Sequence, residues 1–113
     1  MGVVSKESKP IHYLKIKKEY FESVLNGSKK AEFRKESIHK KFQVGNTLVL
    51  KEVVVSPMEY QAEEFLSVEI DYTGREIWCE ITNVTIINDV YPELEKLPEL
   101  YYMISFSIKE KMV

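Results

Sequence analysis

Hydrophobic and polar residues follow two different periods along the first part of the chain. Residues 11–16 (Ile-His-Tyr-Leu-Lys-Ile) alternate loosely with a period of two, which predicts a strand. Residues 17–26 change to the helical period, because their apolar side chains form one stripe, made of Tyr20, Phe21, Val24 and Leu25. Gly27 follows the stripe and is typical of a left-handed C-cap. The pattern therefore predicts a strand followed directly by a short amphipathic helix.

A charged strand is predicted immediately after this helix, over residues 29–35. By the two-residue period, Ala31 and Phe33 are expected to face the core, where Phe21 is also expected. The predicted outer face carries the charged residues Lys30, Glu32 and Arg34. Lys29 precedes them at the mouth of the strand, where a side chain can turn back into a cleft. Charges at such a junction can line a cleft, and this stretch is the best site candidate in the chain.

The middle of the chain predicts one clear strand and one ambiguous segment. A turn at residues 44–46 (Val-Gly-Asn) leads into a strongly apolar strand over residues 47–55. Residues 56–74 support two interpretations, either a short helix or the outer part of a long hairpin. Thr73-Gly74 predicts a turn at the end of this segment.

The last third of the chain predicts two strands separated by a loop. Residues 75–87 form a long strand whose apolar parity changes, from Ile77, Cys79 and Ile81 to Val84 and Ile86. That change indicates a β-bulge near Asn83. Residues 88–100 contain two prolines and several acids, and they predict a loop with a short helical turn. Residues 101–108 predict a closing strand.

These elements favour an α+β fold in a single domain. About five or six short, twisted, mostly antiparallel strands, with one main helix after the first strand, commonly curl into a small β-barrel. The domain is expected to span residues 11–113, behind a flexible polar tail over residues 1–10. The sequence shows no apolar run that could cross a bilayer and no secretory leader, so a cytoplasmic protein is expected. We also expect the protein to be a monomer.

The formal net charge of −2 hides a strong asymmetry along the chain. Residues 1–51 hold 12 Lys and Arg against 5 Asp and Glu, whereas residues 52–113 hold 4 against 13. The first part therefore carries +7 and the second −9. One interpretation is a basic face for nucleic acid. The other is that the two halves interleave in one fold and their charges pair across strands.

The ordered motifs resemble the ASCH domain family. They begin with Leu14-Lys15-Ile16, Tyr20-Phe21 and Leu25-Asn26-Gly27, and continue through residues 29–35 and 42–48. Their core, Gly-x-Lys-x-x-Glu-x-Arg, is moderately specific. The segment Tyr72-Thr73-Gly74-Arg75-Glu76 is similar to a subgroup of small, uncharacterised bacterial and phage proteins. The resemblance covers residues 11–88 and implies the PUA-like β-barrel fold.

The resemblance also implies two kinds of function. ASCH and PUA-like domains are thought to bind RNA in a cleft between barrel and helix, and some small ASCH proteins are amidohydrolases that deacetylate N4-acetylcytidine. Those enzymes use a Lys, a Thr and a Glu in the cleft. Lys29 matches the Lys, but the Thr position is Glu32, which cannot act as a hydroxyl nucleophile. The third member would come from an acidic loop that offers Asp89, Glu93 or Glu95.

The candidate site has a structural alternative. Lys29, Glu32 and Arg34 can form a cross-strand ion-pair ladder, or they can line a cleft in which Arg34 offers a planar fork to a phosphate or base edge. The full set of candidate RNA- or ligand-binding residues is Lys15, Tyr20, Lys29, Lys30, Glu32, Arg34 and Lys35. If the protein is an enzyme, Lys29 and Glu32 are the catalytic candidates. The lysines can equally form a solvated face.

Three functional hypotheses follow. The first is a domain that binds RNA or a nucleotide-like ligand beside Lys29, Glu32 and Arg34. The second is an amidohydrolase acting on a modified nucleoside, with Lys29 as the activated amine or base and Glu32 as a general acid or base. The third is a phage or mobile-element protein-interaction module. His12, His39 and Cys79 lack metal-ligand spacing, so no metal and no cofactor are expected.

Overall fold

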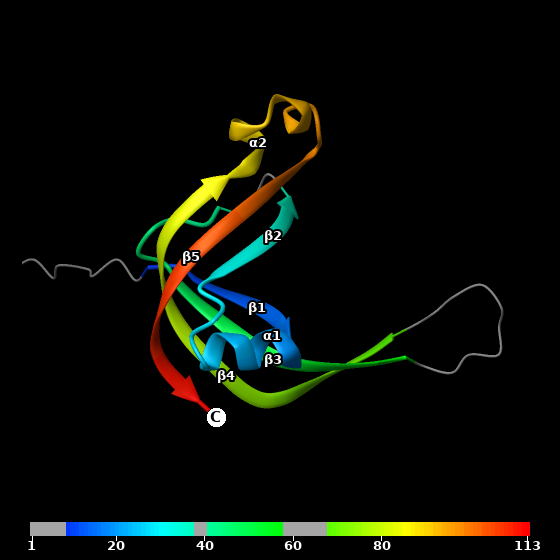
Figure 1. Cartoon of the computed structure of the whole chain (residues 1–113), viewed down its shortest axis with the longest axis vertical. Helices are drawn as coiled ribbons and strands as arrows, with labels where there is room; N and C mark the ends of the chain where they lie inside the picture. The colour runs from blue at the N-terminus through cyan, green and yellow to red at the C-terminus, as the bar shows by residue number, and fades with distance from the viewer. Residues whose placement is uncertain (1–8, 38–40, 58–67) are drawn as a thin grey trace, which may run out of the picture.

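The computed structural model describes residues 9–37, 41–57 and 68–113. Five strands dominate it, together with one eight-residue helix and two short helical turns (Figure 1). In chain order the elements are β1 Ile11–Lys17, α1 Lys18–Leu25, β2 Ala31–Ser37, β3 Thr47–Pro57, β4 Val68–Ile86, α2 Ile87–Val90, the 3-10 turn η1 Pro92–Leu94, and β5 Glu99–Met112. The prediction of about five strands with one main helix after the first is confirmed.

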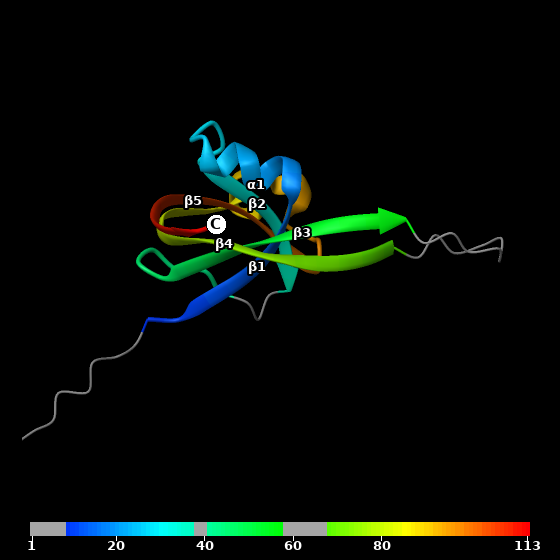
Figure 2. The same ribbon diagram turned by 90° about the horizontal axis from the view of Figure 1, so that it is seen from below.

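The strands form one mixed sheet in the order β1-β3-β4-β5-β2. β1 runs parallel to β3, and the other three pairings are antiparallel. The sheet curls strongly, and α1 lies against it beside β2, while the outer parts of β3 and β4 extend together as an arm (Figures 1 and 2). Within the described residues the sheet is not closed, because β1 and β2 are its two edges. The predicted barrel closure is therefore not observed.

The core fills the inside of the curled sheet. α1 contributes Phe21 and Val24, both fully buried, and the strands contribute alternate aliphatic side chains. The buried cluster also includes Leu14, Ile16, Phe42, Leu48, Leu50, Ile77, Cys79, Ile81, Tyr102, Ile104 and Phe106. The helical stripe was thus predicted correctly for Phe21 and Val24, whereas Tyr20 remains 53% exposed at the rim of the helix.

The predicted facing of β2 is wrong. Phe33 is 51% exposed, whereas Glu32 is only 8% exposed. Two cations contact the Glu32 carboxylate, so its burial is compensated. Phe33 instead lies on the opposite face, with its ring stacked on Tyr101 at a centroid distance of 6.0 Å. The ion pairs of Glu32 with Lys29 and Arg34 have therefore reversed the parity that hydrophobicity alone predicts.

The predicted turn at Thr73-Gly74 is also wrong, because β4 runs through these residues without a break. Gly74 does have a positive φ of 91°, but it lies within β4, where the pairing with β3 is irregular. The register of that pairing shifts between Lys51 and Val53. The bulge expected near Asn83 is confirmed by a register shift between Ile81 and Asn83. Of the ambiguous segment 56–74, residues 58–67 lie outside the described residues, and the rest belongs to a long hairpin.

Asn88 organises the connection between β4 and β5. Its side-chain amide Nδ2 donates to the carbonyls of Leu94 and Glu99, both at 3.0 Å, and its Oδ1 accepts from the backbone N of Tyr101 at 2.7 Å. One buried side chain thus satisfies three backbone groups of an otherwise irregular segment. The predicted loop with a short helical turn is confirmed.

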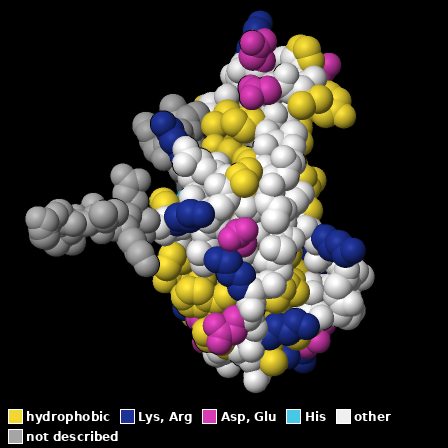
Figure 3. Space-filling model, turned by 90° about the vertical axis from the view of Figure 1, so that its left-hand side faces the viewer, with side chains coloured by type: hydrophobic (Ala, Val, Ile, Leu, Met, Phe, Trp, Pro, Cys, Tyr) yellow, Lys and Arg dark blue, Asp and Glu magenta, His cyan; other side chains and the backbone are white. Residues whose placement is uncertain are grey.

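The two oppositely charged halves of the sequence interleave. β4 and β5, from the acidic half, lie between β2, from the basic half, and β3, which crosses the division at residues 51 and 52. Ion pairs join the halves: Lys51 Nζ lies 3.6 Å from Glu76, and Lys35 Nζ lies 3.5 Å from Glu99. Basic and acidic side chains are interspersed on the face shown in Figure 3, with hydrophobic ones between them. Cross-strand pairs thus join lysines of the basic half to acids of the acidic half.

Two further sequence predictions concern the N-terminal tail and membrane-spanning segments. Of the tail predicted over residues 1–10, residues 1–8 lie outside the described residues. Pro10 already belongs to the fold, since its carbonyl accepts from Thr47 N at 3.1 Å. In the described part of the chain, no helix has the length and apolar character that a membrane span requires.

Cys79 is expected to resist alkylation in the folded protein. It is fully buried in the core, and burial raises the pKa of its thiol to about 12. Because the thiolate is the reactive form, iodoacetamide at about pH 8 should leave the native protein unmodified and react with the urea-unfolded protein. Mass spectrometry measures the difference, and stoichiometric labelling of the native protein would contradict it.

Candidate ligand-binding cavity

A cavity of about 320 Å³ lies where β1, α1 and β2 meet. The residues that line it are Lys15, Ile16, Lys17, Tyr20, Lys29, Glu32, Phe33 and Arg34. Four of these side chains are cationic and one is a carboxylate, so their formal charges sum to +3. The cavity therefore concentrates positive charge at one place in a chain whose net charge is −2.

Glu32 is the centre of the charged wall. Lys29 Nζ lies 3.2 Å from one of its carboxylate oxygens, and Arg34 Nη2 lies 2.7 Å from the other. Since Glu32 is nearly buried, it holds both cations in defined positions rather than leaving them free in solvent. These ion pairs lie within the segment of residues 29–34 and do not form the cross-strand ladder considered from the sequence, and the same three side chains line the cavity.

Arg34 also joins the two edges of the sheet. Its Nη2 donates to the backbone carbonyl of Lys15, so a β2 side chain reaches the β1 main chain. The Nε of the same guanidinium is buried and has no hydrogen-bond acceptor in the part of the chain that the structure describes. Arg34 therefore spans the open seam of the sheet with an incompletely satisfied donor set.

The segment between α1 and β2 positions Lys29. Gly27 adopts a φ of 84° after the helix, and its N donates to the Val24 carbonyl at 3.1 Å, which confirms the predicted C-cap. The backbone N of Lys29 then donates to the Ser23 carbonyl at 2.9 Å. Its ammonium lies 5.8 Å from the centroid of the Tyr20 ring. A half-exposed aromatic ring thus stands beside the cationic wall.

The cavity brings together most of the residues singled out from the sequence. Five of them line it, namely Lys15, Tyr20, Lys29, Glu32 and Arg34. Lys30 is exposed beside a separate apolar depression near Phe106, and Lys35 pairs with Glu99, so neither belongs to the cavity. Lys17 lines the cavity although it was not among the candidates. The period of two along β1 places Lys17 on the same side as Lys15, and that signal could have found it.

None of the three acids considered for the third catalytic position lines the cavity. Asp89 lies on α2, Glu93 on η1, and Glu95 directly follows η1. All three are exposed, and none is among the residues that line the cavity. Among those lining residues, Glu32 supplies the one carboxylate, and the phenol of Tyr20 the one hydroxyl.

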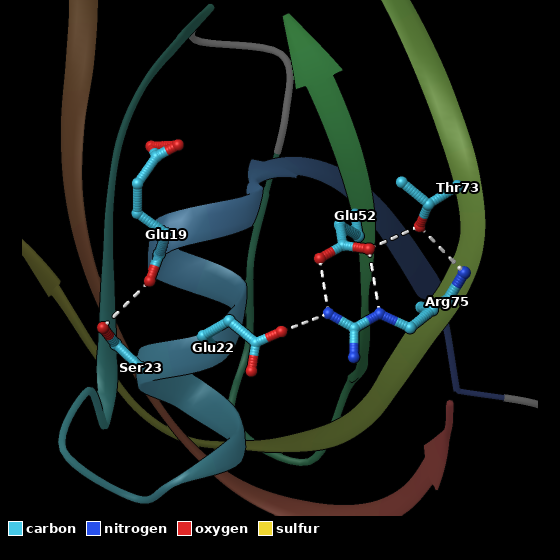
Figure 4. Close-up of polar contacts among 6 residues, drawn as sticks. All are labelled: Glu19, Glu22, Ser23, Glu52, Thr73 and Arg75. Carbon is cyan, nitrogen blue, oxygen red and sulfur yellow. Dashed lines mark hydrogen bonds and ion pairs between the residues drawn. The ribbon is translucent and has the colours of Figure 1, made fainter.

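A second polar cluster lies beside α1, between the helix and the strands β3 and β4, and was missed from the sequence (Figure 4). Glu52 projects from the apolar strand β3 and is only 2% exposed. Arg75 binds it through both arms of its guanidinium, with Nε 2.9 Å from Oε1 and Nη2 2.7 Å from Oε2. Thr73 Oγ1 donates to Glu52 Oε1 at 2.6 Å, and Arg75 Nη2 also pairs with Glu22 of α1.

This cluster attaches α1 to the sheet. Arg75 Cζ lies 4.7 Å from the centroid of the Phe21 ring, so the guanidinium covers the main core residue of the helix. The Arg75 hydrogen bonds hold the pKa of Glu52 below its usual value, against the opposing effect of burial, and Glu52 raises the pKa of Arg75. The arrangement is a permanent ion pair, and α1 in turn forms one wall of the cavity.

Comparison with known proteins gives two matches. A family model described as a domain of unknown function (DUF3850) matches residues 11–96. An uncharacterized 12.9 kDa protein in the GpA 3′ region of Escherichia phage P2 is 35% identical over 79 residues. That alignment covers 70% of this chain and 58% of the phage protein. The family match includes β1, α1 and β2, which build the cavity, and neither description states an activity.

Proposed function

This chain belongs to the DUF3850 family, a domain of unknown function, and from that premise we propose that it binds RNA in the cavity between β1, α1 and β2. We also propose that its curled sheet is an open form of the PUA-like architecture of ASCH domains. The motifs at residues 14–16, 20–21 and 25–35 support this relation, as does the strand-helix-strand order they build.

One observation carries the proposed binding function. The cavity combines four cationic side chains with the half-exposed ring of Tyr20. Lysine and arginine attract the phosphates of RNA, whereas an aromatic face accepts a base. Glu32 keeps Lys29 and Arg34 at fixed positions and can itself accept from an exocyclic amine or a sugar hydroxyl. An inorganic anion would interact with the cationic side chains but would not stack on the Tyr20 ring.

The amidohydrolase hypothesis has less support. Glu32 is held by two cations, and the lining residues offer no aliphatic hydroxyl to act as a nucleophile. The candidates for the third catalytic residue lie elsewhere. We therefore favour binding over catalysis at this cavity.

Lys29→Ala is expected to weaken RNA binding and its salt dependence. Removing one phosphate contact to a single strand should reduce the slope of log K against log salt concentration by about 0.7. The measurement is fluorescence anisotropy of labelled single-stranded RNA at several salt concentrations. Lys109→Ala removes the same charge outside the cavity, where Lys109 pairs with Glu80 at 3.6 Å, and it should bind like the parent.

The same titrations can refute the proposal. Equal affinity and equal slope for the parent and Lys29→Ala would show that the cavity is not the binding site. No binding by the parent even at low salt would remove RNA as the ligand. Arg34→Lys serves as a second variant: it keeps the charge but loses the planar fork, so affinity should fall while the slope stays unchanged.

A further inference from the structure

Two half-exposed tyrosines lie beside the cavity on a neighbouring part of the sheet. Tyr13 of β1 is 56% exposed and Tyr72 of β4 is 53% exposed. Tyr13 and Lys15 project from the face of β1 opposite to the buried Leu14 and Ile16. β3 lies between β1 and β4, so the two rings stand on the two outer strands of three adjacent strands.

Two lysines connect these rings to each other and to the cavity. Lys51 Nζ lies 4.9 Å from the centroid of the Tyr72 ring and 5.9 Å from that of Tyr13. Lys15 Nζ lies 5.8 Å from the Tyr72 centroid, and the same side chain lines the cavity. Tyr13, Lys15, Lys51 and Tyr72 therefore form one surface, the tyrosine platform, which is continuous with the cavity through Lys15.

The charges of the platform suit a phosphate backbone. Lys51 is partly neutralised by Glu76 at 3.6 Å, whereas Lys15 makes no ion pair with any residue in the described ranges. Lys15 therefore contacts the Tyr72 ring of the platform and also lines the cavity that Tyr20 lines. Aromatic rings and lysines that lie next to each other suit the bases and phosphates of a single strand.

We infer that the cavity is one end of a longer site for single-stranded RNA, and that Tyr72 and Tyr13 stack on bases next to the nucleotide in the cavity. The inference rests on the proposed function and narrows its ligand. A free nucleotide would reach the cavity alone. A duplex would keep its bases stacked inside the helix, where the tyrosine rings cannot contact their faces.

The test is a competition experiment with RNAs of different length. Unlabelled CMP, single-stranded oligocytidylates of increasing length and a hairpin with a fully paired stem are compared as competitors of a labelled single strand bound to the parent protein. The affinity should rise with the length of the single strand, and the hairpin should compete poorly. Tyr72→Ala should lose about tenfold in affinity for the longer strands and leave that for CMP unchanged, because one stacking contact is removed.

Two further variants separate stacking from other causes. Tyr72→Phe keeps the ring and should bind the oligomers like the parent. Tyr91→Ala removes a tyrosine that is equally exposed, at 54%, but lies between α2 and η1, and it should also bind like the parent. A loss of affinity in Tyr91→Ala as large as in Tyr72→Ala would contradict the platform.

The outcomes distinguish this inference from the proposed function. If CMP and the longest strand bind equally, and Lys29→Ala weakens both, the platform is overturned while the cavity remains the RNA site. Equal competition by hairpin and single strand would also overturn it. If no competitor displaces the label and the label itself binds Lys29→Ala as well as the parent, the proposed function fails too.

Discussion

Arg75→Met is expected to destabilise the protein more than removal of either carboxylate that Arg75 contacts. The substitution keeps a long apolar side chain over Phe21 but leaves Glu52 as a buried carboxylate with Thr73 as its remaining hydrogen-bond donor. A buried charge that loses its partner carries a large desolvation penalty that nothing offsets. Urea unfolding followed by circular dichroism measures the free energy of unfolding for each variant.

The loss of unfolding free energy is expected to fall in the order Arg75→Met, Glu52→Ala, Glu22→Ala. Glu52→Ala should cost about 2 kcal/mol, because it removes the charge-assisted bonds but leaves a partly exposed guanidinium that water can still reach. Glu22→Ala should cost less than about 1 kcal/mol, since the Glu22 side chain is half exposed. If Arg75→Met proved milder than Glu52→Ala, the cluster would not act as a buried ion pair.

The pH dependence gives the same prediction a second readout. In the parent, the folded-state pKa of Glu52 lies below its usual 4.5, so its contribution is present above that pH and is lost as the pH falls through the lowered value. In Arg75→Met, burial without the guanidinium should raise the pKa instead. The Glu52 penalty is then relieved on protonation, so acidification should narrow the stability gap between variant and parent. If the difference in unfolding free energy between parent and variant stays constant with pH, Glu52 is not the group that destabilises Arg75→Met.

Phe21→Ala is expected to cost about 3–5 kcal/mol of unfolding free energy and to loosen one wall of the cavity. Phe21 is fully buried, and with Val24 it supplies the buried residues of α1. A helix of eight residues is too short to be stable alone, and α1 has no side-chain cap at its N-terminus. Its position therefore depends on packing.

The neighbouring residue provides the matched control. Tyr20→Ala alters the same helix one position away, but Tyr20 is 53% exposed, so its unfolding free energy should change by less than about 1 kcal/mol. The two variants should therefore separate: Phe21→Ala loses stability, whereas Tyr20→Ala keeps stability and loses RNA affinity. Equal losses of stability would mean that α1 is not anchored through Phe21.

The sequence predicted those parts of the fold that depend on neighbouring residues. The helix, its Gly27 cap and the bulge near Asn83 all follow from local periodicity and backbone freedom. The facing of β2 was missed because it depends on where the charges of Lys29 and Arg34 meet Glu32 in three dimensions. The alternation of hydrophobic and polar residues does not show that ion pairs can compensate the burial of an acid.

The candidate site shows the same division. Lys29, Glu32 and Arg34 were identified because they are close in sequence and follow a helix. The Glu52–Arg75 pair was missed because its members are 23 residues apart and Glu52 lies in a strand that is otherwise apolar. An acid inside such a strand implies a buried cation partner, but its identity needs the register of β3 with β4. The Thr73-Gly74 pair similarly predicts a turn unless the ladder is known to continue on both sides.

The pairing of β2 with β5 has a consequence for how the protein is made. β2 is an edge strand whose one neighbour in the sheet is β5, and residues 31–37 pair with residues 99–105. During synthesis, Glu32 and Arg34 leave the ribosome long before the strand that fixes them exists. Such distant pairing slows folding, so the nascent chain carries an unfinished edge while β1, β3 and β4 can already associate. Synthesis must pass residue 105 before the charged wall can form.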